Sequence, residues 1–173
     1  MSANAATWRT LTADGRAGWS DLGNSMIRTD SLGQTYNLTG FQAFCSVNNN
    51  LVMCSAATIT AAPVLTTPAA LLTATITTTG GTLSVAYTPT PLAASTYLAI
   101  FASPQRSAGR AFEGDFRLIL VTAAAAASPA NPLTAYTSKF GAPLVGNRIF
   151  FSLVVITNGF ESGPLITSKV VTA

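Results

Sequence analysis

The spacing of apolar residues near the start of the chain predicts a short helix. Trp19, Leu22 and Met26 recur at intervals of three and four residues, which places them on one face of a helix. The Thr12 hydroxyl is a suitable N-cap for it. Asp14 follows in the first turn, where a negative charge is stabilised by the helix dipole. We therefore expect an amphipathic helix that begins at Thr12 and packs through its tryptophan face.

A second helix is predicted from Thr39, because Gln42 follows it at the spacing of a capping box. Its apolar stripe consists of Phe41, Phe44, Cys45, Asn48 and Leu51. The segment carries no charged residue, so we expect it to be covered by protein, either within the subunit or against a partner. The run Asn48-Asn49-Asn50 is predicted to end the helix, since Asn tolerates the left-handed conformation.

Beyond residue 54 the pattern changes. Residues 55–70 contain Pro63 and Pro68 and are predicted to form an extended connector. From residue 72 apolar side chains alternate with threonine, and Gly80-Gly81 separates two such runs, which is typical of a β-hairpin.

Further strands are expected at 97–102, 116–122, 149–157 and 165–171, separated by proline and glycine turns. A short helix is predicted between them, with Asn131 as its cap, Pro132 in its first turn and Gly141 after its end. The fold class is therefore predicted as mainly β: a sandwich over 71–173, preceded by a connector over 55–70 and a two-helix segment over 1–54.

The shortage of charge changes the functional picture. Charged residues make up 9% of the 173-residue chain, whereas an ordinary soluble domain has about 25%. From Ser31 to Gln105 there is no Asp, Glu, Lys or Arg. Isolated soluble proteins normally carry more surface charge. We therefore predict a subunit whose faces are covered by neighbours, the alternative being a secreted or environmentally adapted monomer.

The net charge of +3 comes from isolated basic residues and not from a run, so no nucleic-acid partner is expected. No apolar window is long enough to predict a membrane span, and residues 1–20 lack the pattern of a secretory signal. The chain contains no histidine. We therefore expect no catalytic site, no cofactor and no metal centre.

Two small groups of residues leave alternatives open. Cys45 and Cys54 could form a disulfide, but we favour two buried free thiols. Glu113 and Asp115 share one face if they lie on a strand, where they could bind Ca²⁺; pairing with Arg110 or Arg117 is the favoured alternative.

The residues that we select as candidate interface anchors are aromatic or basic, the classes that dominate binding energy where subunits meet. The tryptophans could equally fill a helix-helix core, and the arginines could dock an acidic partner or a glycan, or simply solvate the charged edge. The candidates are Trp8, Trp19, Phe41, Phe44, Arg106 and Arg110.

Two stretches resemble known proteins. Leu83, Val85, Tyr87 and Pro89 match the Leu-x-Val-x-Trp-x-x-Pro strand of fibronectin type III domains, with Tyr in place of Trp, and the end of the chain from 151 to 164 matches better. This resemblance covers about 68–173 and implies a fibronectin type III sandwich; because the Trp is missing and a helix intrudes, a generic immunoglobulin-like sandwich is equally open.

The segment from Trp8 to Thr12, followed by Arg16 and Trp19, is similar to an element of uncharacterised phage-encoded and bacterial proteins. It implies a virion or surface-assembly protein. Together with the shortage of charge, the expected sandwich and the lack of catalytic groups, it leads us to expect a structural component of a phage particle, such as a capsid decoration, tail or fibre subunit, whose partners are copies of itself and other structural proteins. The alternatives are an adhesion or carbohydrate-binding module, secreted or at the cell surface, and an extracellular filament subunit.

Overall fold

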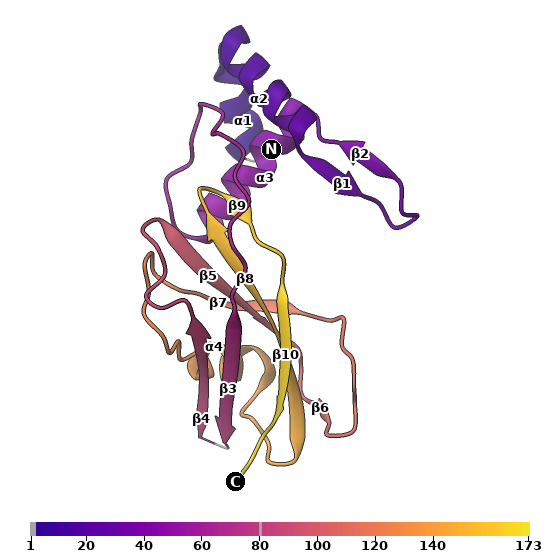
Figure 1. Cartoon of the computed structure of the whole chain (residues 1–173), viewed down its shortest axis with the longest axis vertical. Helices are drawn as coiled ribbons and strands as arrows, with labels where there is room; N and C mark the ends of the chain where they lie inside the picture. The colour runs from indigo at the N-terminus through magenta and orange to yellow at the C-terminus, as the bar shows by residue number, and fades with distance from the viewer. Residues whose placement is uncertain (1–2, 80) are drawn as a thin grey trace. The chain divides into compact units, whose positions relative to one another are not determined.

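The computed structural model describes residues 3–79 and 81–173 (Figure 1). The chain divides into two compact units. The first, here called the helical unit, comprises Met1–Thr67 together with Asn158–Phe160. The second, the sheet unit, comprises Pro68–Thr157 and Glu161–Ala173. The boundary between them at Thr67 falls inside the stretch that the sequence predicts to be an extended connector.

The helical unit is built on three helices and a small hairpin, where the sequence predicted two helices. The helix not anticipated is the first, which contains Trp8 and ends just before Leu11. The bounds are α1 Ala3–Thr10, α2 Ala13–Ser25, α3 Gly40–Met53, β1 Ile27–Thr29 and β2 Thr35–Asn37.

Both helix starts predicted from capping residues are confirmed. The Thr12 hydroxyl accepts a hydrogen bond from the Gly15 N–H at 3.1 Å, so α2 begins where expected. At α3 the capping box is complete, because Gln42 N–H donates to the Thr39 hydroxyl and the Gln42 side chain accepts from the Thr39 N–H. Each cap satisfies amide donors that a helix leaves unpaired in its first turn.

The asparagine run does not end α3, and that prediction is wrong. The helix continues through it to Met53. Asn48 is fully buried, and its amide binds the backbone of Ile59, accepting from N–H at 2.8 Å and donating to C=O at 3.1 Å. Asn50 donates to the Gly159 C=O at 2.9 Å. These side chains fix chain segments against the helix, a role that residue type and spacing do not reveal.

The core of the helical unit is a single apolar cluster under α2 and α3. Phe160, which directly follows the Asn158-Gly159 turn near the end of the chain, belongs to this cluster. Gly159, which precedes it, has positive φ, and a Cβ there would come within 2.6 Å of Val47. The buried members are Leu11, Trp19, Leu22, Met26, Ala43, Phe44, Val47, Leu51 and Phe160.

The sheet unit contains antiparallel sheets and one helix, α4 Leu133–Phe140. The larger sheet has the order β10-β8-β5-β7, with β6 and β9 pairing to β8 outside that order, and β3-β4 form a separate hairpin. The strands are β3 Thr73–Thr79, β4 Thr82–Thr88, β5 Thr96–Ala102, β6 Arg106–Ser107, β7 Arg117–Val121, β8 Asn147–Thr157, β9 Phe160–Glu161 and β10 Leu165–Val170.

One core cluster collects side chains from both sheets and from α4. It includes Ile76 and Val85 of the hairpin, Leu98 of β5, Leu153 of β8 and Tyr136 of α4, all at most 5% exposed. The predicted alternation is confirmed in β4, where every second residue is buried. Strand β8 also supplies every second residue to this cluster, but its other face is buried as well, with Phe150 and Ile156 at most 4% exposed. Gly141 ends α4 as predicted, but the helix N-cap is Pro132, so the predicted Asn131 cap is wrong.

Strands account for 33% of the chain and helices for 25%. The expectation of a mainly β chain is therefore met only roughly: strands predominate, but four helices occur among the described residues. Within that part of the chain, no helix is both long and apolar enough to cross a membrane.

Helices α2 and α3 cross where two glycines allow their backbones to meet. A Cβ on Gly23 would lie 2.5 Å from the Leu38 carbonyl oxygen, and one on Gly40 would lie 2.7 Å from the Ser20 hydroxyl and 2.9 Å from its backbone nitrogen. Gly18, also on α2, has room, because the nearest atom to its Cβ would be Ala62 Cβ at 3.7 Å.

We expect Gly23→Ala to destabilise the protein by about 1–3 kcal/mol, because the added methyl group would meet rigid backbone. Gly18→Ala on the same helix should instead raise stability by up to ~1 kcal/mol through helix propensity alone. Urea unfolding followed by circular dichroism measures both, and equal effects of the two substitutions would contradict the close crossing at Gly23.

Candidate functional site

The four aromatic interface candidates form one continuous cluster in the helical unit. The Trp19 and Phe44 rings meet edge to face with centroids 5.2 Å apart. Trp8 stacks at a tilt against Phe44 at 5.4 Å and against Phe41 at 5.5 Å. The cluster thus joins α1, α2 and α3, and runs from the core to the surface.

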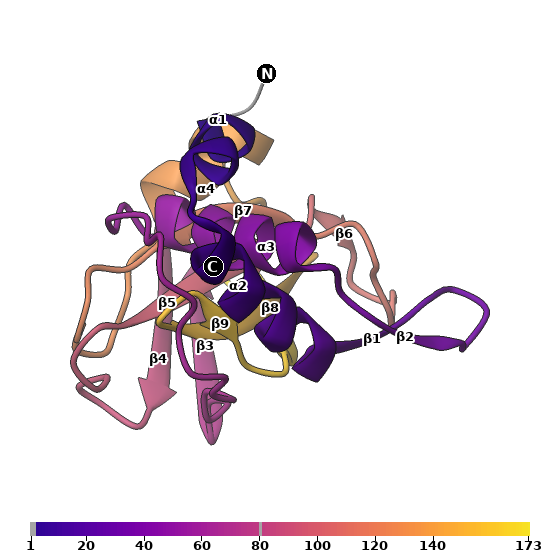
Figure 2. The ribbon, with the colours of Figure 1, turned by 90° about the horizontal axis from the view of Figure 1, so that it is seen from above.

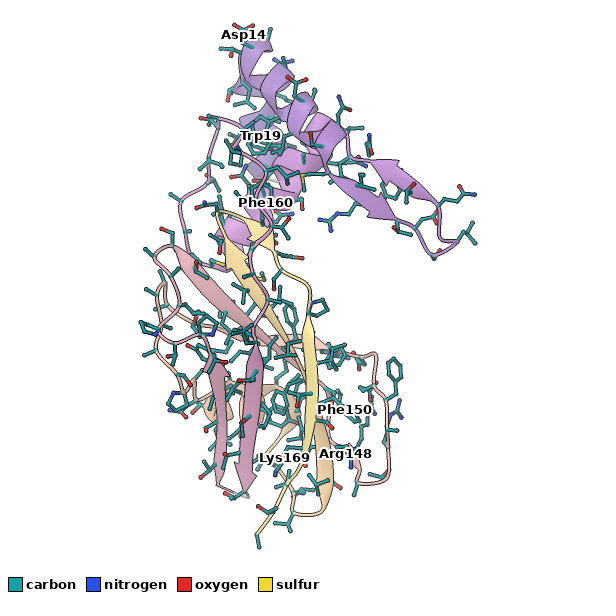
Figure 3. All side chains as sticks on the ribbon, viewed as in Figure 1. Asp14, Trp19, Arg148, Phe150, Phe160 and Lys169 are labelled. Atoms are coloured by element: carbon teal, nitrogen blue, oxygen red, sulfur yellow. The ribbon has the colours of Figure 1, made fainter. Side chains whose placement is uncertain are left out.

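Trp19 and Phe44 are core residues and do not form a surface. Trp19 is fully buried and Phe44 is 1% exposed, and Figure 3 labels Trp19 among the helices. The indole N–H of Trp19 donates to the Thr60 C=O at 2.8 Å, so its polar atom is also satisfied. The expectation that these two residues anchor an interface is therefore corrected, because neither can reach a partner while the helical unit is folded.

Phe41 and Trp8 lie at the outer end of the aromatic cluster. Phe41 is 38% exposed and Trp8 is half-buried. They are the aromatic candidates that a partner can contact. At the other end of α3, Val52 is 57% exposed, so this uncharged helix carries apolar side chains on its outer surface as well as on its core face.

The two basic candidates lie in the sheet unit, where both pair with one carboxylate. Arg106 forms a hydrogen-bonded ion pair with Glu113, and Arg110 Nε lies 3.5 Å from the same Glu113 oxygen. Arg110 also donates to the Phe112 C=O at 2.7 Å. A separate exposed pair joins Arg117 to Asp115 at 3.4 Å. The favoured pairing of these acids with arginines is confirmed, although Arg106 was not foreseen as the main partner of Glu113.

Glu113 is held ionised by its surroundings. Its other carboxylate oxygen accepts from the N–H groups of Asp115 at 3.0 Å and Gly114 at 2.9 Å. These bonds, led by that from Asp115, together with Arg106, lower the pKa of Glu113 from 4.5 to about 2. The side chain is only 4% exposed. Glu113 is thus a structural anion that organises the loop between β6 and β7, and its oxygens are occupied by protein donors.

Sequence reasoning missed Arg148, which lies directly across from Arg106 where β6 pairs with β8. Like charges on facing positions repel, so the carboxylate of Glu113 is needed to neutralise this edge. The Nε atom of Arg148 is buried and has no hydrogen-bond partner among the described residues. A single arginine before an apolar strand gives no signal by which the sequence could have shown this pairing.

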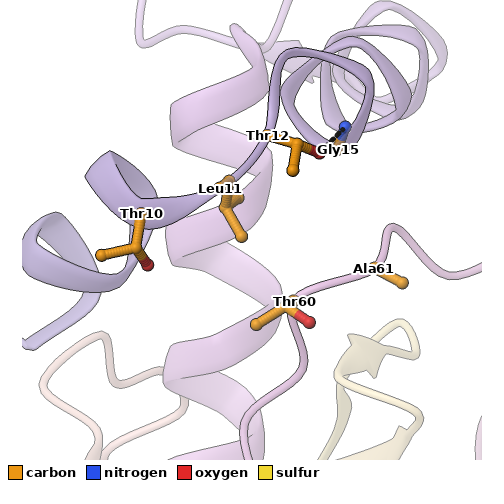
Figure 4. A pocket seen from close by; sticks show the side chains of 6 residues that line it. All are labelled: Thr10, Leu11, Thr12, Gly15, Thr60 and Ala61. Carbon is orange, nitrogen blue, oxygen red and sulfur yellow. Dashed lines mark hydrogen bonds between the residues drawn. The ribbon is translucent and has the colours of Figure 1, made fainter.

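The helical unit has a shallow pocket of about 380 Å³ (Figure 4). None of its side chains titrates near neutral pH, and two of its hydroxyls are already used: Thr12 caps α2, and Thr10 donates to the Thr7 C=O at 2.7 Å. Its chemistry is limited to weak polar and apolar contact. It is lined by Thr10, Leu11, Thr12, Gly15, Thr60 and Ala61.

The described residues contain no group of three or more metal-ligating side chains. Cys45 and Cys54 are both free thiols, as favoured, although only Cys54 is buried and Cys45 is half-buried. Burial raises the pKa of each thiol. Raised pKa values keep both thiols protonated and unreactive near neutral pH.

The hairpin β1-β2 is the surface feature that sequence reasoning passed over. All of its strand residues are exposed, and Ile27, Leu32 and Tyr36 expose 67%, 82% and 47% of their surface. A signal was present: short β-prone runs stand on either side of the Asp30 and Gly33 turn residues.

Comparison with known proteins found no match: no family model matches the chain, and neither does any curated protein sequence.

The aromatic cluster yields a matched pair of substitutions. Phe44→Ala should lower the free energy of unfolding by about 3–5 kcal/mol, because it empties a buried site. Phe41→Ala removes a ring of the same size that is 38% exposed and does not belong to the core cluster, so its cost should stay within ~1 kcal/mol. Chemical denaturation measures both, and similar costs would contradict the division between core and surface made here.

Glu113 makes stability depend on pH in acid. Its pKa in the folded protein is below its ordinary value of 4.5, so its contribution is complete above pH 4.5 and is lost as pH falls toward about 2. Glu113→Gln should therefore flatten the fall in stability between these values. At pH 7 it should also cost more than Asp115→Asn, which breaks only the exposed pair with Arg117. Thermal unfolding across this pH range measures the effect. If stability falls with pH in the same way in Glu113→Gln as in the wild-type protein, Glu113 does not have this role.

Proposed function

We propose that this chain is a non-catalytic structural subunit of a phage virion, in the class of capsid decoration, tail or fibre proteins. Its partners are other copies of itself and other structural proteins of the particle. The observation that carries this proposal is the coincidence of exposed apolar side chains with the charge-free stretch of the chain.

Within residues 31–105, which contain no ionised side chain, several large apolar residues face outward. Leu32 and Val64 are more than four-fifths exposed. Monomeric soluble proteins surround exposed apolar groups with charge, which limits association. Here α3 and the connector over 55–70 carry no charged residue of their own. The exposed members are Leu32, Tyr36, Phe41, Val52, Val64, Leu65 and Leu72.

For the sheet unit we propose an immunoglobulin-like or fibronectin type III-like sandwich. The shared core supports this, since β3-β4 and the larger sheet contribute side chains to one cluster. In such a fold two sheets are held together by apolar contact between their inner faces. The fold itself names no function, so the placement in a virion rests on surface composition and on the resemblance of residues 8–19 to phage-encoded proteins.

The test is to look for the chain in particles. We expect particles purified by density gradient from a lysate of the source culture to contain the protein, detected by mass spectrometry after chymotrypsin digestion. Chymotrypsin is chosen because trypsin leaves residues 29–106 as one long peptide, since no Lys or Arg lies between Arg28 and Arg106. Immunogold labelling with an antibody to the purified chain then locates it on the particle.

A known structural protein of the same particle is the positive control, and a cytoplasmic host enzyme is the negative control. Recovery of the chain only from the cell surface or the culture medium would overturn the virion assignment in favour of an adhesion module. Recovery only with the soluble host enzymes would overturn both assignments.

A further inference from the structure

The hairpin β1-β2 projects from the helices as a two-stranded ribbon, as Figures 1 and 2 both show. Its register pairs Ile27 with Asn37, Arg28 with Tyr36, and Thr29 with Thr35. Its tip is fixed by Asp30, whose carboxylate accepts from the N–H groups of Leu32 and Gln34. Two strands alone are only marginally stable in water, so a ribbon of this kind is best stabilised by a further strand.

The register shows which backbone groups of β2 are free. Leu38 N–H donates to the Met26 C=O, and Asp30 N–H donates to the Gln34 C=O. Because hydrogen-bonded and non-hydrogen-bonded pairs alternate along antiparallel strands, the N–H and C=O groups of Thr35 and Asn37 point away from β1. Their neighbours on that edge are already engaged: Gly33 N–H donates to the Asp30 C=O and Thr39 N–H to the Gln42 side chain. The edge therefore offers four adjacent backbone groups.

The edges of the sheet unit are protected, in contrast. Val85 of β4 exchanges two hydrogen bonds with Ala130, at 2.8 and 2.9 Å. The Thr78 C=O of β3 accepts from the N–H and the hydroxyl of Thr172. On β7 the Lys139 ammonium donates to the Leu118 C=O at 2.7 Å.

β10 carries the exposed Lys169. Proteins keep sheet edges from associating by pairing them with another segment, by covering them, or by placing a charged residue such as lysine on them. Strand β2 has no such protection, because it carries neither charge nor proline.

We propose that β2 is a self-pairing strand, which joins antiparallel to β2 of a second copy of this chain and forms a continuous four-stranded β1-β2-β2-β1 sheet. Thr35 lies opposite Asn37 of the second copy and Asn37 opposite its Thr35, so all four free backbone groups of each strand are paired. The two Tyr36 residues face each other at the two-fold axis. This inference rests on the proposed function, because it names the contact through which an assembly subunit meets its own copy.

Electrostatics selects β2 over β1 for this contact. The same arrangement made through β1 would place Arg28 directly opposite Arg28 of the second copy, and facing like charges destabilise a sheet. Through β2, Tyr36 faces Tyr36, and aromatic cross-strand pairs stabilise a sheet. Arg28 lies beside Tyr36 on the same face of each hairpin, so the pair is flanked by the two arginines without bringing them together.

Proline substitutions test which edge pairs. The wild-type chain should sediment as a monomer-dimer equilibrium that depends on concentration. Asn37→Pro removes the outward N–H from both copies without breaking a bond inside the hairpin, and should raise the dissociation constant by at least about tenfold. Thr29→Pro is the matched control, because it removes an outward N–H from the β1 edge, and it should leave the dissociation constant unchanged.

Disulfide trapping tests the register independently of stability. In a background of Cys45→Ala and Cys54→Ala, Tyr36→Cys should form a covalent dimer on mild oxidation. Residues in facing non-hydrogen-bonded positions have Cα atoms about 4.5 Å apart, which is within the reach of a disulfide. Arg28→Cys, on the same face one strand further out, should not cross-link, since about 14 Å would separate the two residues.

The outcomes separate this inference from the proposed function. A chain that assembles with other virion proteins but stays monomeric alone, or whose dimer is unaffected by Asn37→Pro, overturns the pairing of β2 and leaves the structural role intact. Equal weakening by Thr29→Pro and Asn37→Pro, without trapping at Tyr36→Cys, would show open-ended pairing of β1 with β2 and overturn the two-fold contact. A β2-dependent dimer absent from any particle would overturn only the virion role.

Discussion

In both units of this protein, buried backbone groups have to be paired where charged side chains are scarce. Neutral side chains perform the task repeatedly. Asn48 binds the N–H and C=O of Ile59 as a neighbouring strand would. Ser128 and Ser162 accept from the N–H groups of Tyr87 and Val155, both at 3.0 Å. Because an unpaired buried amide costs more than a typical hydrogen bond contributes, these few amide and hydroxyl groups determine where the irregular segments lie.

The loop around Glu113 follows the opposite principle. There a buried carboxylate collects two guanidinium groups and two backbone N–H donors, at the edge where Arg106 faces Arg148. This arrangement is self-sufficient, since each carboxylate oxygen already has protein donors. It explains why Arg106 and Arg110 are engaged within the chain, since both pair with the Glu113 carboxylate.

The sequence predicted features that depend on local chemistry. The caps at Thr12 and Thr39 bind amides three residues away, and the alternation in β4 reflects a core on one side of the strand, so both can be recognised from spacing. Features set by distant residues were missed. Asn50 continues α3 because it binds Gly159, and Trp19 is internal because Phe44 and Thr60 cover it. Whether an aromatic residue lies in the core or at the surface depends on such distant partners, and the spacing of apolar residues along the sequence does not identify them.

The hairpin β1-β2 shows how the lack of charged residues leaves a strand edge open to association. An exposed edge strand is normally prevented from associating by charged residues, and β1 retains this protection through Arg28. The charge-free stretch begins at Ser31, immediately after β1 and before β2, so the protection ends between the two strands of one hairpin. The same stretch continues through α3 and the connector, whose outer surfaces carry Phe41, Val52 and Val64. One compositional feature thus accounts for both an unprotected strand edge and exposed apolar side chains, and on these two observations the proposed assembly role rests.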